Sequence, residues 1–332
     1  MLATFVLLLA SAGIIYLSCE LFVNGVEWLG RKLDVSQTAT GSILAAFGTA
    51  LPESVVTLVA TAFGDHQAQK QIGVGAALGG PLALSTIAYA VVGLCLLVYG
   101  QRLGRGDRVL VKVDGSRLSR DQAWFLGIFV FKIALGLVAF SFKPWLGIAF
   151  LAAYAGYFWA EMKGEGDDEE GEPAALKLRP RDANPHLGWV LAQTAAATLA
   201  IFAASRVFVG QLEAVGPWLR LSPQLTALLL SPIATELPET MNAFIWVRQG
   251  KERLALANIS GAMMIQATVP TAFGLFFTPW VLDRPLLAAA AVTGLSICFL
   301  FLAFRRGQVS GAMLSQVGWL YGVFGIAAMA VR

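Results

Sequence analysis

Long stretches of apolar residues follow one another along the whole chain, separated by short polar segments. Five stretches contain no Lys, Arg, Asp or Glu: residues 71–100, 144–160, 254–282, 285–304 and 307–331. Five more contain only a few ionisable residues: 2–29, 35–64, 122–142, 187–212 and 221–247. Because about 20 apolar residues cross a bilayer as one helix, the pattern predicts an all-α integral membrane protein with ten transmembrane helices.

Composition supports this class and excludes others. Of the 332 residues, 57% are hydrophobic and 14% are charged, whereas a soluble domain carries about a quarter charged residues. The net charge of +3, without a basic run interleaved with aromatics, argues against a nucleic-acid partner. Neither HExxH nor GxSxG occurs, and His66 and His186 lie at predicted loop ends. We expect a protein that is not an enzyme and needs no cofactor, with membrane lipid as a partner and no obligatory protein partner.

The loop charges predict the orientation. Alternate loops hold 17 of the 24 Lys and Arg residues, and the positive-inside tendency assigns these loops to the cytoplasm. Both termini are then expected outside the cytoplasm. Short loops and the lack of a targeting extension favour a bacterial inner membrane.

A charged loop at residues 163–185 separates two sets of five predicted helices, at 1–162 and 186–332. It contains the acidic run GEGDDEEGE at 164–172. Such a run could act as a cation sensor or as a feeder for a pore. We interpret the loop instead as a solvated, disordered cytoplasmic linker, because charge-rich segments bury too little apolar surface to fold.

The two halves match each other at a fixed offset of 186 residues. The match is tightest where TALPE at 49–53 meets TELPE at 235–239. Because each half has an odd number of predicted helices, the halves should enter the membrane from opposite sides. This is an inverted-topology repeat, which places a substrate site near the bilayer midplane where the repeats meet.

The centre of each half is a proline followed at once by a glutamate: Pro52 with Glu53, and Pro238 with Glu239. Proline lacks an N–H and clashes with the preceding turn, so each helix is expected to break there and to free backbone carbonyls. Carboxylates and carbonyls are the hard oxygen ligands that Na⁺ and Ca²⁺ require. In the alternative, each glutamate is neutral and hydrogen-bonded or reaches an interface. Two symmetry-matched positions beside helix breakers favour the cation site.

At these residues the sequence resembles the calcium/cation antiporter superfamily, which includes the sodium/calcium exchangers. The motifs of that family, G-T-S-L-P-E and G-S-N-I-F-N, correspond here to GTALPE at 48–53, ATELPE at 234–239 and GAMMIQ at 261–266. The resemblance implies a fold of two exchanger repeats, with Glu53 and Glu239 as the central calcium-binding glutamates. It also implies that the carbonyls of Thr49 and Thr235 hold the flanking ions.

Several positions depart from the family pattern. Glu236 replaces a serine and adds a third carboxylate, and Gln266 places an amide where members carry Asn or Asp. The third helix, GAALGGPLAL at 75–84, lacks the Ser and Asn of the motif whether Gly75 or Gly79 is aligned with the family glycine. Because these side chains line the sodium sites of the family, the sequence leaves the number and identity of the coupling ions undetermined. The predicted metal ligands are Thr49, Glu53, Thr235, Glu236, Glu239 and Gln266.

Three further charges lie in predicted membrane spans. Glu20 and Arg206 occupy equivalent positions of the two halves with opposite sign. They either form an ion pair across the pseudo-twofold axis or each find a backbone or water partner. Lys132, in the middle of the fourth span, either neutralises a carboxylate of the site or leans toward the lipid headgroups.

The expected function is secondary-active cation antiport by alternating access, with Ca²⁺ as the favoured cargo. One divalent cation, two monovalent cations or protons could each satisfy the same buried carboxylates, and this competition is the physical basis of exchange. Because the third helix lacks the polar side chains of the family's sodium sites, we consider coupling to protons nearly as well supported as coupling to Na⁺. The alternative is a non-transporting membrane protein of the same fold that binds a cation structurally or as a sensor.

Overall fold

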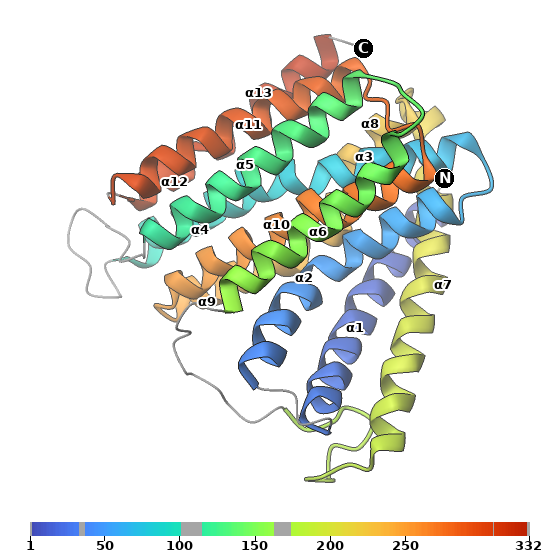
Figure 1. Cartoon of the computed structure of the whole chain (residues 1–332), viewed down its shortest axis with the longest axis vertical. Coiled ribbons are helices and arrows are strands. Elements are labelled where there is room, and N and C mark those ends of the chain that lie inside the picture. The colour runs from blue at the N-terminus through green and yellow to red at the C-terminus, as the bar shows by residue number, and fades with distance from the viewer. Residues whose placement is uncertain (1, 33–36, 101–114, 163–173, 308, 331–332) are drawn as a thin grey trace.

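Long helices packed alongside one another form the described part of the protein (Figure 1). The computed structural model describes residues 2–32, 37–100, 115–162, 174–307 and 309–330. The regular elements in these ranges are helices, which confirms the predicted all-α class.

The helices follow the predicted apolar stretches closely. The first half contains α1 (Leu2–Lys32), α2 (Gln37–Ala62), α3 (Gln67–Ala83), the π-helical turn η1 (Leu84–Ala88), α4 (Tyr89–Tyr99), α5 (Gly115–Leu137), the 3₁₀ turn η2 (Lys143–Trp145) and α6 (Leu146–Met162). The second half contains α7 (Leu187–Leu219), α8 (Pro223–Thr235), α9 (Leu237–Arg248), α10 (Glu252–Phe277), α11 (Arg284–Arg305), α12 (Gly311–Gln316) and α13 (Gly318–Ala330). Each predicted stretch coincides with one helix or with consecutive helices.

Six helical segments are long and apolar enough to cross a bilayer: Leu2–Lys32, Gln67–Tyr99, Leu187–Leu219, Glu252–Phe277, Arg284–Arg305 and Gly311–Ala328. The protein is therefore a multi-pass membrane protein. Six segments do not account for ten crossings, so the predicted number of ten stays a prediction.

The centre of the bundle is formed by α3 and α10, which belong to the two most buried of these six segments. α3 packs along α8 and α10 packs along α2, so each half contributes a central helix that contacts the other half. α1 lies beside α7 with much of its apolar surface uncovered, as expected for helices that face lipid (Figure 1). The polar residues that come from α2, α8 and α10 consequently meet in the interior.

The two predicted helix breaks differ in the structure. α8 and α9 are separated at Glu236, and Pro238 lies in the first turn of α9, where a missing N–H costs little. α2 instead continues through Pro52, and its ribbon bends partway along (Figure 1). The prediction of a break at Pro52 was wrong, because a helix can absorb an internal proline as a kink.

Part of the predicted disordered linker packs against the helices. The acidic run at 164–172 lies outside the described residues, but the segment that follows contacts α1. Asn24 Nδ2 and Trp28 Nε1 both donate to the Ala174 carbonyl, at 3.1 and 2.9 Å, and Leu176 is buried beside Trp28. The expectation of disorder was therefore wrong for residues 174–178, since a buried leucine and backbone hydrogen bonds hold them in place.

We expect deletion of residues 164–172 to leave both cation flux and thermal stability unchanged, because the anchoring contacts begin at Ala174. Flux into proteoliposomes and the Tm of the purified protein measure the two effects. The contrasting variant is Trp28→Ala, which removes a buried ring and its hydrogen bond and should cost about 3–5 kcal/mol of stability. A deletion variant with normal Tm and reduced flux would instead give the acidic run a role as a sensor or feeder.

Candidate cation site

Buried polar residues from four elements meet in the middle of the bundle. Glu53 comes from α2, Glu236 from the break between α8 and α9, and Glu239 from the first turn of α9. Gln266 lies on α10. None of these side chains is more than 3% exposed, and the Glu53 carboxyl is within electrostatic range of Glu236 and Glu239. Four of the six predicted ligands are thus brought into one region.

Glu236 links the helix break to the central helix α10. Thr235 Oγ1 donates to Glu236 Oε1 at 2.8 Å, and Gln266 Nε2 donates to Glu236 Oε2 at 2.7 Å. Thr235, the fifth predicted ligand, therefore supports this carboxylate through its hydroxyl group. Thr49, the sixth, belongs to α2, but its side chain lies outside the described part of the chain.

Backbone carbonyls beside the motif threonines lack their usual helical donors. A helical carbonyl bonds to the N–H four residues later, and Pro52 and Pro238 have no N–H. The carbonyls of Gly48 and Ala234 are therefore available to other partners. The sequence resemblance implies the carbonyls of Thr49 and Thr235 as ligands. The missing proline N–H instead frees the carbonyls of Gly48 and Ala234, one residue earlier in each motif.

Several buried oxygens near the glutamates receive no hydrogen bond from the described residues. They are both carboxylate oxygens of Glu53, Thr57 Oγ1, Ser231 Oγ and Gln266 Oε1. Because about nine in ten buried polar groups are hydrogen-bonded, a concentration of exceptions indicates a place for a ligand.

Thr57 and Ser231 were not among the ligands predicted from the sequence. Thr57 follows Glu53 by one turn of α2, and Ser231 precedes Thr235 by one turn of α8, so each lies on the same helix face as a motif residue. This four-residue spacing was the available signal. It is a weak signal, because hydroxyl groups in helices commonly bond to the carbonyl one turn earlier, as Thr61 Oγ1 does to the Thr57 carbonyl at 2.7 Å.

Glu53 and Glu236 bring two buried carboxyl groups close together. Two carboxylates at such a distance repel each other unless a proton or a cation lies between them.

A glycine of α3 makes room for the Glu53 carboxylate. A Cβ atom placed at Gly80 would overlap both Glu53 oxygens. The two glycines considered for the family alignment have other neighbours: Gly75 lies against the backbone of Gln224, and Gly79 against the Leu228 carbonyl. They allow the close packing of α3 on α8, whereas Gly80 is the position that adjoins the candidate site.

Lys132 on α5 points into the bundle and not toward the headgroups. Its side chain is completely buried, and Nζ donates to the Ala77 carbonyl of α3 at 2.9 Å. The ammonium lies 5.4 Å from the centre of the Phe129 ring and within electrostatic range of Glu53. The interpretation that Lys132 leans toward the headgroups was therefore wrong.

The proposed ion pair between Glu20 and Arg206 is not present. Arg206 Nη2 lies 3.5 Å from Asp65 Oδ2, and Glu20 is hydrogen-bonded to Tyr16 on its own helix. Matching positions in two repeats need not touch, because the helix rotation decides which way each side chain points.

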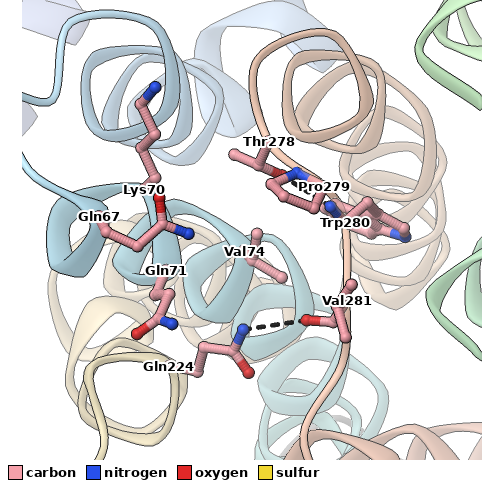
Figure 2. A pocket seen from close by; sticks show the side chains of 9 residues that line it. All are labelled: Gln67, Lys70, Gln71, Val74, Gln224, Thr278, Pro279, Trp280 and Val281. Atoms are coloured by element: carbon pink, nitrogen blue, oxygen red, sulfur yellow. Dashed lines mark hydrogen bonds between the residues drawn. The ribbon is translucent and has the colours of Figure 1, made fainter. Parts of the chain in front are cut away.

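A cavity of about 190 Å³ lies at the N-terminal end of α3 (Figure 2). It lies between α3, the start of α8 and the segment that follows α10. The Gln224 side chain donates to the Val281 carbonyl at 3.0 Å across its floor, and Lys70 points away from that bond. Val74, which also lines the cavity, precedes Gly80 by six residues, which is about 9 Å along the helix.

No three His, Cys, Asp or Glu side chains within the described ranges are placed to hold one metal ion together. The chemistry of the region is instead mixed, with carboxylate, amide, hydroxyl and carbonyl oxygens. Hard cations such as Na⁺ and Ca²⁺ accept all of these ligands.

Buried carboxylates inside a bundle of apolar helices define a class of protein, a multi-pass membrane transporter for small cations. The sequence matches the family described as sodium/calcium exchanger protein over residues 3–163 and 189–331. The chain therefore belongs to the sodium/calcium exchanger family, and it is a cation antiporter and not an enzyme.

Known proteins resemble the chain along most of its length. The inner membrane protein YrbG of Escherichia coli strain K12 is 25% identical, with 94% of this chain and 91% of YrbG covered. The crystal structure of the H⁺/Ca²⁺ exchanger CAX has a TM-score of 0.74 at 18% identity and covers 99% of this chain and 86% of its own. The sodium-calcium exchanger NCX_Mj has a TM-score of 0.59 at 19% identity, with 97% of each chain covered. The two structural likenesses establish the exchanger fold.

Proposed function

We propose that the protein moves Ca²⁺, or a cation of similar chemistry, against a gradient of Na⁺ or H⁺ by alternating access to the buried site. The observation that carries this proposal is the set of buried oxygens without donors around Glu53. In a multi-pass antiporter, such a group of buried oxygens offers a binding place for a cation, and a second cation can compete for the same oxygens.

The proposed ligands are Glu53, Glu239, Glu236 and Gln266, with the carbonyls of the motif threonines Thr49 and Thr235. The hydroxyls of Thr57 and Ser231 add two neutral oxygens. Ca²⁺ takes six to eight oxygen ligands in flexible geometry, whereas Mg²⁺ demands a strict octahedron and usually retains its waters. A mixed set on four different elements therefore suits Ca²⁺ better than Mg²⁺.

The proposed architecture is ten helices in two inverted repeats, at 1–162 and 186–332, joined by an acidic linker at 163–185. Two separate matches to one family, at 3–163 and 189–331, support this division. The packing of α3 on α8 and of α2 on α10 also supports it, because those two pairs are equivalent when the halves are exchanged.

We further propose a bacterial inner membrane, with both termini outside the cytoplasm and with lipid and cations as the only partners. The location of YrbG, stated in its name, supports the membrane assignment. The distribution of Lys and Arg between alternate loops supports the orientation.

The test is a cation and pH screen of counterflow with the purified protein in liposomes. We expect ⁴⁵Ca²⁺ uptake that requires an opposing Na⁺ or H⁺ gradient and that stops when the gradient is dissipated. Absence of gradient-driven flux for every cation tested would refute the proposal.

A second candidate is a protein of the same fold that binds a cation without transporting it. One observation favours it: the third helix has lost its polar motif residues. Saturable Ca²⁺ binding by calorimetry, combined with no gradient-driven flux in the same preparation, would select this candidate.

A further inference from the structure

The third helix replaces its lost polar side chains with an unusual backbone contact. Pro81 lies four residues after Ala77 and has no N–H, so the Ala77 carbonyl cannot form its normal helical hydrogen bond. The Lys132 ammonium occupies that carbonyl instead, at 2.9 Å. A carbonyl freed by a proline is a typical ligand for a monovalent cation in a transporter helix, and here a side-chain cation holds it.

Two neighbours of the Lys132 ammonium attract a positive charge, the Ala77 carbonyl and the Phe129 ring. The side chain is fully buried, and the Phe129 ring lies beside the ammonium at a distance suited to a cation–π contact. Gly80, three residues after Ala77 on α3, adjoins the Glu53 carboxylate, so Lys132 and Glu53 contact the same stretch of this helix without a direct ion pair in the part of the chain that the structure describes. The Glu53 oxygens thus remain open to a transported cation while the lysine lowers the charge of the region.

We propose that Lys132 is a built-in monovalent cation of the transport site, which occupies the Ala77 carbonyl in place of one coupling ion. This inference rests on the proposed antiport function. Glu53, Glu236 and Glu239 carry three negative charges when ionised, and Lys132 reduces the total to two. One divalent cation or two monovalent cations then neutralise the site, so the exchange of one Ca²⁺ for two Na⁺ or two H⁺ is electroneutral.

The experiment compares wild type with Lys132→Met in proteoliposomes in which K⁺ and valinomycin set the membrane potential. Wild-type ⁴⁵Ca²⁺ flux should be independent of potential, with two monovalent ions exchanged per Ca²⁺. Lys132→Met leaves a third uncompensated carboxylate and should exchange three monovalent ions per Ca²⁺, with flux that changes as the potential changes.

Lys143 provides a matched control, because it is also a buried lysine bonded to backbone carbonyls. Its Nζ donates to the carbonyls of Val138, Pro279 and Trp280 at 2.7–2.9 Å, and none of these belongs to the candidate site. Lys143→Met should keep the wild-type ratio and its independence of potential. Equal ratios in wild type and Lys132→Met, or a potential-dependent wild type with three ions per Ca²⁺, would overturn the proposal.

A stability measurement covers the case in which Lys132→Met folds poorly. If Lys132 compensates Glu53, the double variant Lys132→Met/Glu53→Gln should have a higher Tm than Lys132→Met alone, because the uncompensated charge is removed together with the lysine. A double variant that is less stable than Lys132→Met, or equal to it, overturns the charge compensation. This measurement needs no transport, so it separates failure of this inference from failure of the antiport proposal, which the wild-type flux alone decides.

Discussion

Glu53→Gln and Glu239→Gln are each expected to reduce gradient-driven Ca²⁺ flux by at least about a hundredfold. Both side chains are buried in the bundle, and the substitution removes a charge while keeping nearly the same shape. A pair of unit charges about 4 Å apart interacts by about 4 kcal/mol at an effective dielectric constant near 20, and each 1.4 kcal/mol is a tenfold change in binding. Initial rates of ⁴⁵Ca²⁺ uptake into proteoliposomes measure the effect.

The control for this prediction is Glu20→Gln. Glu20 undergoes the same chemical change on a membrane helix, but its side chain is exposed on α1 and bonded to Tyr16. We expect flux close to wild type. If both central variants transport Ca²⁺ at wild-type rates and with normal Tm, the assignment of Glu53 and Glu239 to the site is wrong.

Gly80→Ala is expected to reduce Ca²⁺ flux strongly, although it adds only one methyl group outside the predicted ligand set. The new Cβ would overlap the Glu53 carboxylate, so either the carboxylate or α3 has to move. Overpacking of a tight interior costs about 1–3 kcal/mol, and a carboxylate pushed from its position no longer matches the other ligands. Uptake rates and Ca²⁺ affinity from calorimetry should both fall by about tenfold or more.

Gly294→Ala is the matched control, since a Cβ at this position of α11 meets no atom within 4 Å. It should leave the flux unchanged and should raise stability slightly, because alanine favours the helix over glycine by about 1 kcal/mol. Wild-type flux in Gly80→Ala would show that Glu53 does not need its present position against α3.

Helix positions could be predicted from the sequence because their signals are local. Continuous apolar stretches mark the helices whatever their neighbours are, and the start of α7 and both ends of α11 lie close to the predicted ones. The two Pro–Glu pairs marked Glu53 and Glu239 for a similar reason, since a helix breaker beside a carboxylate in an apolar span is rare. The different outcomes at Pro52 and Pro238 were not predictable, because the surrounding packing decides between a kink and a break.

Contacts between helices were the part that the sequence left open. Gln266 was predicted as a cation ligand, and the structure shows that its amide nitrogen binds Glu236 while its oxygen remains open. Repeat symmetry offered Glu20 as one of two kinds of partner for Arg206, whereas its actual neighbour is Asp65. In both cases the helix rotation and the approach of a distant segment decide the partner.

The sequence by itself determined that this is an all-helical membrane protein of the sodium/calcium exchanger family with a few candidate carboxylates in its spans. These conclusions follow from hydropathy, composition and short motifs, which do not depend on how the helices are arranged. Only the tertiary structure decided that Lys132 bonds to the carbonyl freed by Pro81 and that Gly80 adjoins Glu53. Such contacts join residues from different helices, and the direction of a side chain across a bundle depends on helix rotation and register, which a single sequence does not specify.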